Sequence, residues 1–255
     1  MEAIILGSGT SQGVPVIGCK CDVCKSRNPK DNRLRASLLL KINNTNILID
    51  AGPDFRQQML REKVESLDAI IFTHEHKDHI AGLDDVRAFN FSTKQPMEIF
   101  AERRVQTALR NDYSYVFSGS NYPGIPRLNL NTIDEEAFFI KDIKITPIRA
   151  MHYNLPILGF RIGNLTYITD ANYISEEEKL KIIGSKTLII NALRKEKHIA
   201  HFSLDEALKI VNECSPRKAY FTHIAHQMGL HNEINTLLPD FTELAHDGLS
   251  IKFDI

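Results

Sequence analysis

The fold of this chain is decided by the stretch Thr73-His74-Glu75-His76-Lys77-Asp78-His79. It directly follows the apolar run Ala69–Phe72, which predicts a buried strand, and it precedes Ile80–Leu83, which can open a helix. Its three imidazoles and two carboxylates would be costly to bury together without a metal ion. A tight loop at the end of a strand can point all of them into one cleft. Because imidazole and carboxylate ligands suit zinc, manganese or iron, the stretch predicts a transition-metal site.

Short apolar runs alternate with helical patterns through the rest of the chain, which predicts a layered α/β or α+β fold. Buried strands are expected at Ala3–Leu6, Leu38–Ile42, Asn46–Ile49, Ile143–Ile148, Leu165–Thr169, Thr187–Ile190 and Ala219–Phe221, with Asn43–Thr45 as a hairpin turn. Helices are expected at Phe55–Lys63, Arg103–Arg110, Glu176–Ile183 and Leu204–Asn212. The pairs Ser175/Glu178 and Ser203/Glu206 have the spacing of capping boxes.

The region from Phe89 to Asp142 is less regular and contains Pro96, Pro123 and Pro126. Two interpretations of it stay open, a long functional insertion and an ordinary connection. The sequence does not predict its role.

The composition is that of an ordinary globular protein, with 255 residues, 43% hydrophobic and 25% charged. This length fits a single domain over residues 1–255. The formal net charge is −1, so no overall positive field attracts nucleic acid or anionic lipid, and neither is expected as a partner. Every apolar run is shorter than the ~20 residues of a membrane span, and the N-terminus lacks the basic segment of a signal peptide. The expected location is therefore the cytoplasm, where clustered cysteines are metal ligands more often than disulfides.

Three further candidate ligands, His152, Asp170 and His223, each end or follow one of the predicted strands. A single polar residue at a strand end is commonplace. The joint placement of all three, in addition to the histidine-rich stretch, is much more specific and favours a shared metal site.

The pattern His-x-His-x-Asp-His after a strand, followed by these three residues, resembles the metallo-β-lactamase superfamily. The resemblance implies an αββα sandwich spanning the whole chain, with a two-metal site at one edge. It assigns His74, His76 and His152 to one metal, Asp78, His79 and His223 to the other, and Asp170 to both. Two divalent cations, zinc or manganese with iron as a third option, would lower the pKa of a water held between them and make it a nucleophile.

The chain also contains a cysteine cluster, Cys-x-Cys-x-x-Cys, formed by Cys19, Cys21 and Cys24. This is the close spacing of ligands to a structural zinc, which needs a fourth ligand. Spacing alone leaves Cys214, His226, His231 or another histidine for that position. Cys214 continues an apolar helical pattern and is expected to be a buried helix residue.

The segment Gly7–Pro15, followed by the cysteine motif, is similar to the PhnP branch of the superfamily, the phosphoribosyl 1,2-cyclic phosphate phosphodiesterases of phosphonate breakdown. The similarity extends through Leu48–Gly52 and ends in Thr222–Gln227. It implies that His226 completes the structural zinc, and it suggests a homodimer. A similar cysteine motif occurs in the PqqB relatives, so this motif alone does not determine the reaction.

The same resemblance implies a histidine before a helix that protonates the leaving group, and His201 matches it. His198 is a nearby alternative that the sequence leaves open. Arg87, or else Arg149, is a candidate to bind phosphate, because a guanidinium group can donate two parallel hydrogen bonds. A surface salt bridge is an equal interpretation of each arginine.

The two remaining histidines, His231 and His246, match no motif and are expected at the surface.

The favoured function is a dinuclear metal-dependent phosphodiesterase that acts on a small cyclic phosphate diester, with Asp78 and His201 essential to catalysis. A ribonuclease like tRNase Z shares the metal motif, but Gln227 stands where that family usually continues with Ser and then Arg-Tyr. A thioester or lactone hydrolase is a third hypothesis, because the same nucleophile could attack a carbonyl carbon. A non-catalytic metal-binding protein is the fourth, and the complete set of predicted ligands argues against it.

Overall fold

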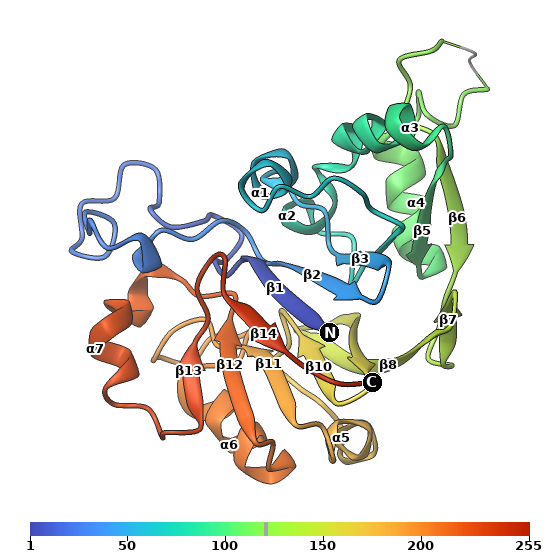
Figure 1. Cartoon of the computed structure of the whole chain (residues 1–255). Helices are drawn as coiled ribbons and strands as arrows, with labels where there is room; N and C mark the ends of the chain where they lie inside the picture. The colour runs from blue at the N-terminus through green and yellow to red at the C-terminus, as the bar shows by residue number, and fades with distance from the viewer. Residues whose placement is uncertain (120–121) are drawn as a thin grey trace.

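The computed structural model describes residues 1–119 and 122–255, and in these residues two β-sheets pack face to face between layers of helices (Figure 1). The first sheet has the strand order β14-β1-β2-β3-β4-β5-β6, and the second has the order β13-β12-β11-β10-β9-β8-β7. The two chain ends meet at one end of the molecule, where Phe253 N donates to Met1 O. The arrangement is the expected αββα sandwich.

The bounds of the first sheet are β1 (Glu2–Gly7), β2 (Ser37–Ile42), β3 (Thr45–Ile49), β4 (Ala69–Ile71), β5 (Met97–Ala101), β6 (Leu128–Thr132) and β14 (Ser250–Lys252). Those of the second are β7 (Phe138–Ile140), β8 (Ile143–His152), β9 (Leu155–Ile162), β10 (Leu165–Ile168), β11 (Thr187–Asn191), β12 (Lys218–Thr222) and β13 (Thr242–Leu244). The α-helices are α1 (Phe55–Arg61), α2 (Lys77–Ile80), α3 (Arg87–Thr93), α4 (Arg103–Asp112), α5 (Glu176–Ile182), α6 (Leu204–Cys214) and α7 (His231–Asn235). Short 3₁₀ turns are η1 (Pro29–Asp31), η2 (Leu83–Val86) and η3 (His226–Met228). None of the helices in the described ranges is long and apolar enough to span a membrane.

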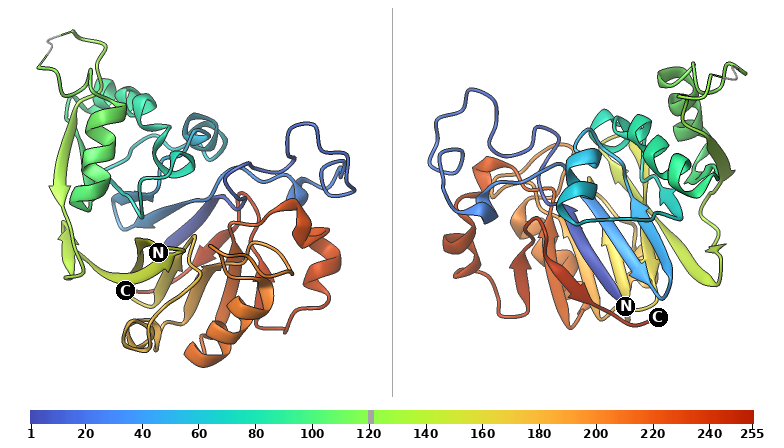
Figure 2. Two further views of the ribbon diagram at one scale, coloured as in Figure 1. Left: turned by 180° about the vertical axis from the view of Figure 1, so that it is seen from behind. Right: turned by 45° about the horizontal axis from the view of Figure 1, so that its top comes forward.

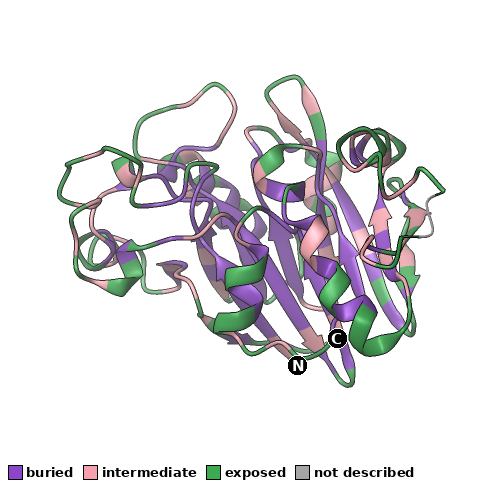
Figure 3. Ribbon diagram, turned by 90° about the horizontal axis from the view of Figure 1, so that it is seen from above, coloured by how far each residue is buried: buried purple, intermediate pink, exposed green. Residues whose placement is uncertain are grey.

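The strands are apolar on both faces because each sheet is covered on both sides, as Figures 2 and 3 show. In β1, Ala3 and Ile5 face the second sheet, while Ile4 and Leu6 pack against the helices α1, α3 and α4. The same alternation continues in β2, β3 and β4. On the other side, α5 and α6 cover the second sheet through a separate apolar cluster.

The sequence predicted capping boxes at the first residues of two helices, α5 and α6. The structure has a complete capping box at α6 and half of one at α5. At α6, Ser203 and Glu206 form a reciprocal capping box. At α5, Ser175 accepts from Glu178 N, but the Glu178 carboxylate instead accepts from Arg149 N at 2.6 Å. Glu178 therefore ties α5 to β8 and does not close a capping box.

One predicted strand end was wrong, and the structure decides the role of one region that the sequence left open. Strand β8 does not stop at Ile148 but continues to His152, because it pairs with β9 along its whole length up to His152 opposite Leu155. The region 89–142 is neither a loop insertion nor a simple connection in its described part. It contributes β5 and β6 to the first sheet, β7 to the second, and α4 to the covering layer, while residues 120–121 lie outside the described residues.

The strand directions place the carboxyl ends of the central strands of both sheets at the same edge of the sandwich. Strands β3, β4 and β5 are parallel, and so are β10, β11 and β12, so the carboxyl ends of each set lie together. Backbone bonds then join the two edges: Leu158 N donates to Thr73 O, and Ile224 N donates to Ser8 O. Every predicted ligand of the dinuclear site lies at this joint edge.

Candidate metal centre

The histidine-rich stretch after β4 and the three later candidates come together in two adjoining groups. The ligand atoms within each group lie within 4.8 Å of one another, and the groups are His74, His76 and His152, and Asp78, His79, Asp170 and His223. These are the seven residues that the sequence predicted as ligands. Asp170, predicted to bind both metals, lies in the second group and also within reach of His152 and His201.

In the first group, the ring nitrogens that could bind a cation face one another. His74 Nε2 lies 3.1 Å from His76 Nδ1, while His74 Nδ1 is held by the Thr73 hydroxyl at 2.9 Å. His152 Nδ1 donates to Ala200 O at 2.7 Å, which leaves its Nε2 for a ligand. Burial lowers the pKa of His74 and of His76 below their usual values. Neutral imidazole is the form that binds metal, so this group is prepared for a cation.

In the second group, carboxylates and imidazoles crowd together in a buried space. His79 Nε2 lies 3.1 Å from Asp78 Oδ2 and 3.1 Å from Asp170 Oδ2, and His223 Nε2 lies 3.0 Å from Asp170 Oδ1. Burial opposes the charge on His79, but the surrounding carboxylates outweigh it and raise its pKa well above the usual value. The same pairing lowers the pKa of Asp170 well below its usual value despite burial. The pKa of Asp78 is lowered in the same way, so Asp78 and Asp170 are both ionised at neutral pH.

The donor set fits divalent cations because several buried nitrogens need a partner. Among the described residues, His79 Nε2 and His223 Nε2 are buried without a hydrogen bond of good geometry, and both face the carboxylates of this group. Buried polar atoms are almost always satisfied, so these two atoms fit the role of metal ligands. A divalent ion bound by these imidazoles and carboxylates would satisfy both.

Asp50 is a functional residue to which sequence reasoning gave no role. It follows β3, is fully buried, and accepts from Thr73 N at 2.9 Å while its Oδ2 lies 2.7 Å from His79 Nδ1. A carboxylate behind a ligating histidine sets the orientation of the ring and makes it a stronger ligand. The motif Leu48–Gly52 marked this position in the sequence, but only the fold brings Asp50 to His79.

Position 52 must be a glycine because the loop that carries the predicted ligands packs directly against its backbone. A Cβ atom at Gly52 would overlap the carbonyl oxygen of Asp78, and one at Gly82 would overlap the carbonyl oxygen of Gly52. The backbone contacts Ala51 N to His79 O (2.8 Å) and Gly82 N to Ala51 O (2.9 Å) need this close approach. The loop after β3 thus holds the histidine-rich stretch in place.

We predict that Asp50→Asn lowers metal affinity, and with it hydrolytic activity, by about 10–100-fold, the usual cost of losing such a supporting carboxylate. Asparagine keeps the size of the buried side chain but removes the negative charge facing His79. Calorimetric titration with metal measures the affinity, and kcat/KM at a fixed metal concentration below saturation measures the loss of activity that follows from it. The matched control is Asp68→Asn, at the opposite end of β4 in an ion pair with Lys141. Equal metal affinity in the wild type and Asp50→Asn would disprove the role.

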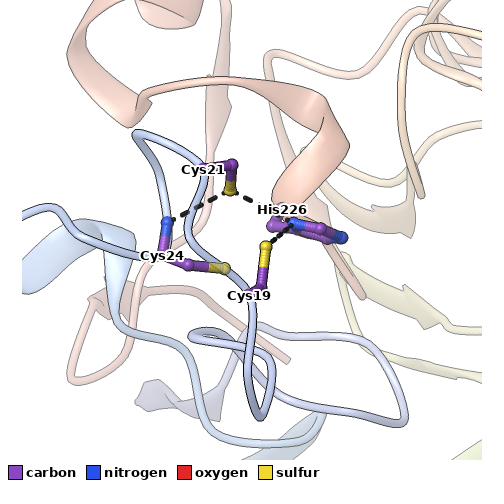
Figure 4. A group of neighbouring side chains, drawn as sticks. All are labelled: Cys19, Cys21, Cys24 and His226. Carbon is purple, nitrogen blue, oxygen red and sulfur yellow. Dashed lines mark hydrogen bonds between the residues drawn. The ribbon is translucent and has the colours of Figure 1, made fainter.

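The cysteine cluster forms a second, separate group with His226 (Figure 4). His226 Nδ1 lies 3.4 Å from Cys19 Sγ and 3.3 Å from Cys21 Sγ. A tetrahedral zinc would place a sulfur and a nitrogen roughly 3.5 Å apart, given its usual bond lengths. The hydrogen bond to His226 lowers the pKa of the Cys21 thiol, and Cys24 N donates to Cys21 Sγ. The group therefore fits a structural zinc with His226 as the fourth ligand.

The cysteine group and the second group of the dinuclear site are joined by the two residues between His223 and His226. His223 follows β12, and His226 begins η3. Between them, Ile224 N donates to Ser8 O and Ile224 O accepts from Thr10 N, which fastens this segment to the loop that leads to the cysteines. Figure 1 shows that loop projecting beside α7, away from the sheets. A metal at the cysteine group would thus fix the position of His223.

His201 lies against the dinuclear site, while His198 lies outside it. His201 Nδ1 is 3.7 Å from Asp170 Oδ1, and its ring stacks on that of His223 with centroids 4.8 Å apart. The ring of His198 lies on the far side of His201, at 5.1 Å between ring centroids, and its Nδ1 accepts from Ala200 N. Burial lowers the pKa of His201 to about 3, so its ring is neutral in the protein alone. A phosphate anion beside it would raise that pKa and favour the protonated, donating form.

The candidate arginines are both in ion pairs. Arg87 pairs with Asp84 at 3.1 Å and is nearly half exposed, and Arg149 pairs with Glu102 at 2.6 Å. Phosphate binding by Arg87 stays a prediction.

His231 is not at the surface, contrary to expectation. It is buried, and its Nδ1 accepts from Arg33, itself a buried residue, at 3.1 Å. Burial and the charge of Arg33 lower the pKa of His231 to about 4. His246 packs edge-on against it, with ring centroids 5.7 Å apart. Both histidines therefore support the fold behind the cysteine loop.

Comparison with known proteins agrees with this geometry. A family model described as beta-lactamase superfamily domain matches residues 45–224, so the chain belongs to the beta-lactamase superfamily and is a metal-dependent hydrolase of that class. The crystal structure of a new diphosphatase from the PhnP family is 36% identical, with a TM-score of 0.94 over 100% of this chain and 98% of the other. Within the superfamily, the chain is a member of the PhnP family.

Two other relatives extend the comparison. Zn²⁺-bound PqqB from Methylobacterium extorquens has a TM-score of 0.83 at 17% identity over 99% of this chain and 100% of the other, and so shares the fold. A protein named octanoyltransferase from Porphyromonas gingivalis is 38% identical over 100% of this chain. The match spans only 52% of that protein, so this chain corresponds to about half of it.

Proposed function

We propose that the protein is a dinuclear metal-dependent phosphodiesterase that hydrolyses a small cyclic phosphate diester, either a phosphoribosyl cyclic phosphate or a compound like a cyclic nucleotide. The observation that carries the proposal is the meeting of seven ligands in two adjoining groups with His201 beside them. The similarity to a PhnP-family diphosphatase supports phosphate chemistry.

Each residue has a defined task in this proposal. When bound, the two divalent ions supply Lewis acidity for phosphate and activate water. Asp170 lies beside His79 and His223 of the second group and also within reach of His152 of the first, so it would serve as a ligand to both ions. Asp50 and Ala200 O orient His79 and His152, and His201 holds the proton that the leaving oxygen takes up. A cyclic diester suits this arrangement, because ring opening produces an alkoxide that needs a proton.

A substrate panel tests the proposal. The metal-loaded protein is assayed with ribose cyclic phosphates, 2′,3′-cyclic nucleotides, pre-tRNA, and thioesters or lactones, each with zinc, manganese and iron. We expect the highest kcat/KM with a small cyclic diester. The net charge of −1 supports a small substrate over a long nucleic acid. Preferential cleavage of pre-tRNA would replace the proposal with a ribonuclease.

We expect His201→Ala to slow diesters with poor leaving groups by about 10²–10⁴-fold, the usual contribution of general acid catalysis, and activated aryl esters far less. An alkoxide needs a proton as it departs, whereas a nitrophenolate does not. Comparing kcat for a cyclic nucleotide and for bis(p-nitrophenyl) phosphate measures the difference. His198→Ala is the control, since that ring lies behind His201. Equal losses on both substrates would disprove the acid role.

A second candidate is hydrolysis of an acyl thioester, and the observation that favours it is the relative named octanoyltransferase. That name describes acyl transfer by a protein about twice as long as the match. The same site could direct water to a carbonyl carbon. An octanoyl thioester in the panel decides this, since turnover of it above that of every phosphate diester would favour the second candidate.

A further inference from the structure

An apolar pocket of about 400 Å³ opens beside the first metal group. Its lining residues are His76, His152, Tyr153, Asn154, Leu155 and Ala200. Apart from the two metal ligands, these lining side chains carry no ionisable charge other than the tyrosine hydroxyl. A group attached to a phosphate held at the metal ligands would extend into this pocket.

Tyr153 occupies a position in the chain that tyrosine normally avoids. It is the first residue of the two-residue turn between β8 and β9 and has a φ of 56°, in the left-handed region that is uncommon for bulky residues. The hairpin between β2 and β3 has the same two-residue length and also has a positive φ, 52°, at the first position. There the residue is Asn43, which tolerates this conformation. Lys141 also has a positive φ, 54°, at the first position of the two-residue turn between β7 and β8, so this conformation is shared by the three hairpins. Among these three turns, the one beside the metal ligands is the one that presents a tyrosine.

Hydrogen bonds to Asn172 hold the turn in place next to the predicted metal ligands, and they limit the positions that the Tyr153 ring can take. Tyr153 N donates to Asn172 Oδ1 at 2.7 Å, and Asn172 comes two residues after the predicted bridging ligand Asp170. Asn172 N also donates to Met151 O at 2.8 Å. Even so, 54% of Tyr153 is exposed. Strained residues that persist at a functional site usually serve the site, and an exposed aromatic ring serves it by contact.

We propose that Tyr153 is an aromatic platform on which a nucleobase of the substrate stacks while the phosphate lies at the metal ligands. This inference rests on the proposed phosphodiesterase function and narrows its substrate to nucleotides. The uncharged lining suits a planar base. The lining contains no lysine or arginine to bind the second phosphate group that a phosphoribosyl cyclic phosphate carries.

The first test compares 2′,3′-cyclic AMP with ribose cyclic phosphate, which lacks the base, in the wild type and in Tyr153→Ala. Loss of base stacking should raise KM for cyclic AMP about tenfold with a much smaller change in kcat. The preference for cyclic AMP over the baseless compound should fall by the same factor. Tyr153→Phe, which keeps the ring face, should retain the preference.

Two further variants separate a functional from a structural role. Tyr153→Asn reproduces the residue found at Asn43, so it should raise the melting temperature and still lose the preference for the base. Phe139→Ala removes another exposed aromatic side chain, opposite Lys144 on β8. Lys144 lies eight residues before His152 on the same strand, so this control is roughly 26 Å from the pocket.

Calorimetric titration with AMP and with ribose 5-phosphate measures binding without turnover. Tighter binding of AMP that disappears in Tyr153→Ala supports the platform, and an unchanged AMP preference in Tyr153→Ala overturns it. Failure of the metal-loaded wild type to hydrolyse any phosphate diester would overturn the phosphodiesterase function itself. The calorimetric result would still show whether Tyr153 binds a base.

Discussion

Asp78→Ala should reduce hydrolysis by about 10³-fold or more while leaving the protein folded. Asp78 Oδ2 lies 3.1 Å from His79 Nε2 and 3.7 Å from His223 Nε2. Burial opposes its charge, but His79 and His223 hold the pKa of the carboxyl far below its usual range, so it is a ready ligand at every physiological pH. Without it, the second group keeps two imidazoles and the shared Asp170 and loses the one carboxylate that would belong to that ion alone, which weakens its hold on the ion.

The measurements for this prediction are kcat/KM, metal content and circular dichroism. We expect one metal fewer per chain and an unchanged spectrum, because Asp78 lies in the short helix α2 outside the three apolar clusters. Lys77→Ala is the matched control: it alters the preceding residue, whose ion pair with Asp112 points away from the ligands. Full activity of Asp78→Ala would exclude it from the metal centre.

Cys21→Ala should lower the melting temperature by on the order of 10 °C, since loss of a structural metal site costs several kcal/mol and each kcal/mol shifts a protein of this size by about 2–4 °C. The cysteine loop has little apolar burial of its own, and Cys21 is exposed. The loop's order therefore depends on the ligands that join it to His226. Its displacement would also loosen Ile224 and, next to it, His223.

Thermal melting and zinc analysis test this prediction together. The variant should lose one zinc per chain and, secondarily, part of its activity. Lys20→Ala, in the same loop, is the control and should melt with the wild type. A Cys21→Ala protein that melts like the wild type would remove the structural role of the cluster.

Much of the site could be predicted from the sequence because its ligands follow local rules. The strands alternate between two apolar faces, and a run such as Ala69–Phe72 predicts its own burial. His74, Asp78 and His79 are close in the chain, so a single loop brings them together whatever the rest of the fold does. The cysteines are equally local.

Other features required the tertiary structure, because they depend on contacts between residues far apart in the chain. Asp50 reaches His79 only because β3 and β4 are parallel neighbours. His231 is buried because Arg33, 198 positions earlier, packs beside it. His152 lies at the end of a longer strand than its own sequence predicts, because β9 pairs with β8 to the last residue.

The sequence by itself determined the class of fold, the two sets of metal ligands and the chemistry that they can support. Ligand type and local spacing are properties of the chain, and the free energy of metal binding depends directly on them. Only the tertiary structure decided what surrounds the ligands: the carboxylate behind His79, the histidine beside Asp170, and the strained ring of Tyr153 next to an apolar pocket. The physical reason is that orientation, burial and strain arise from packing between distant segments, and no short stretch of sequence contains them.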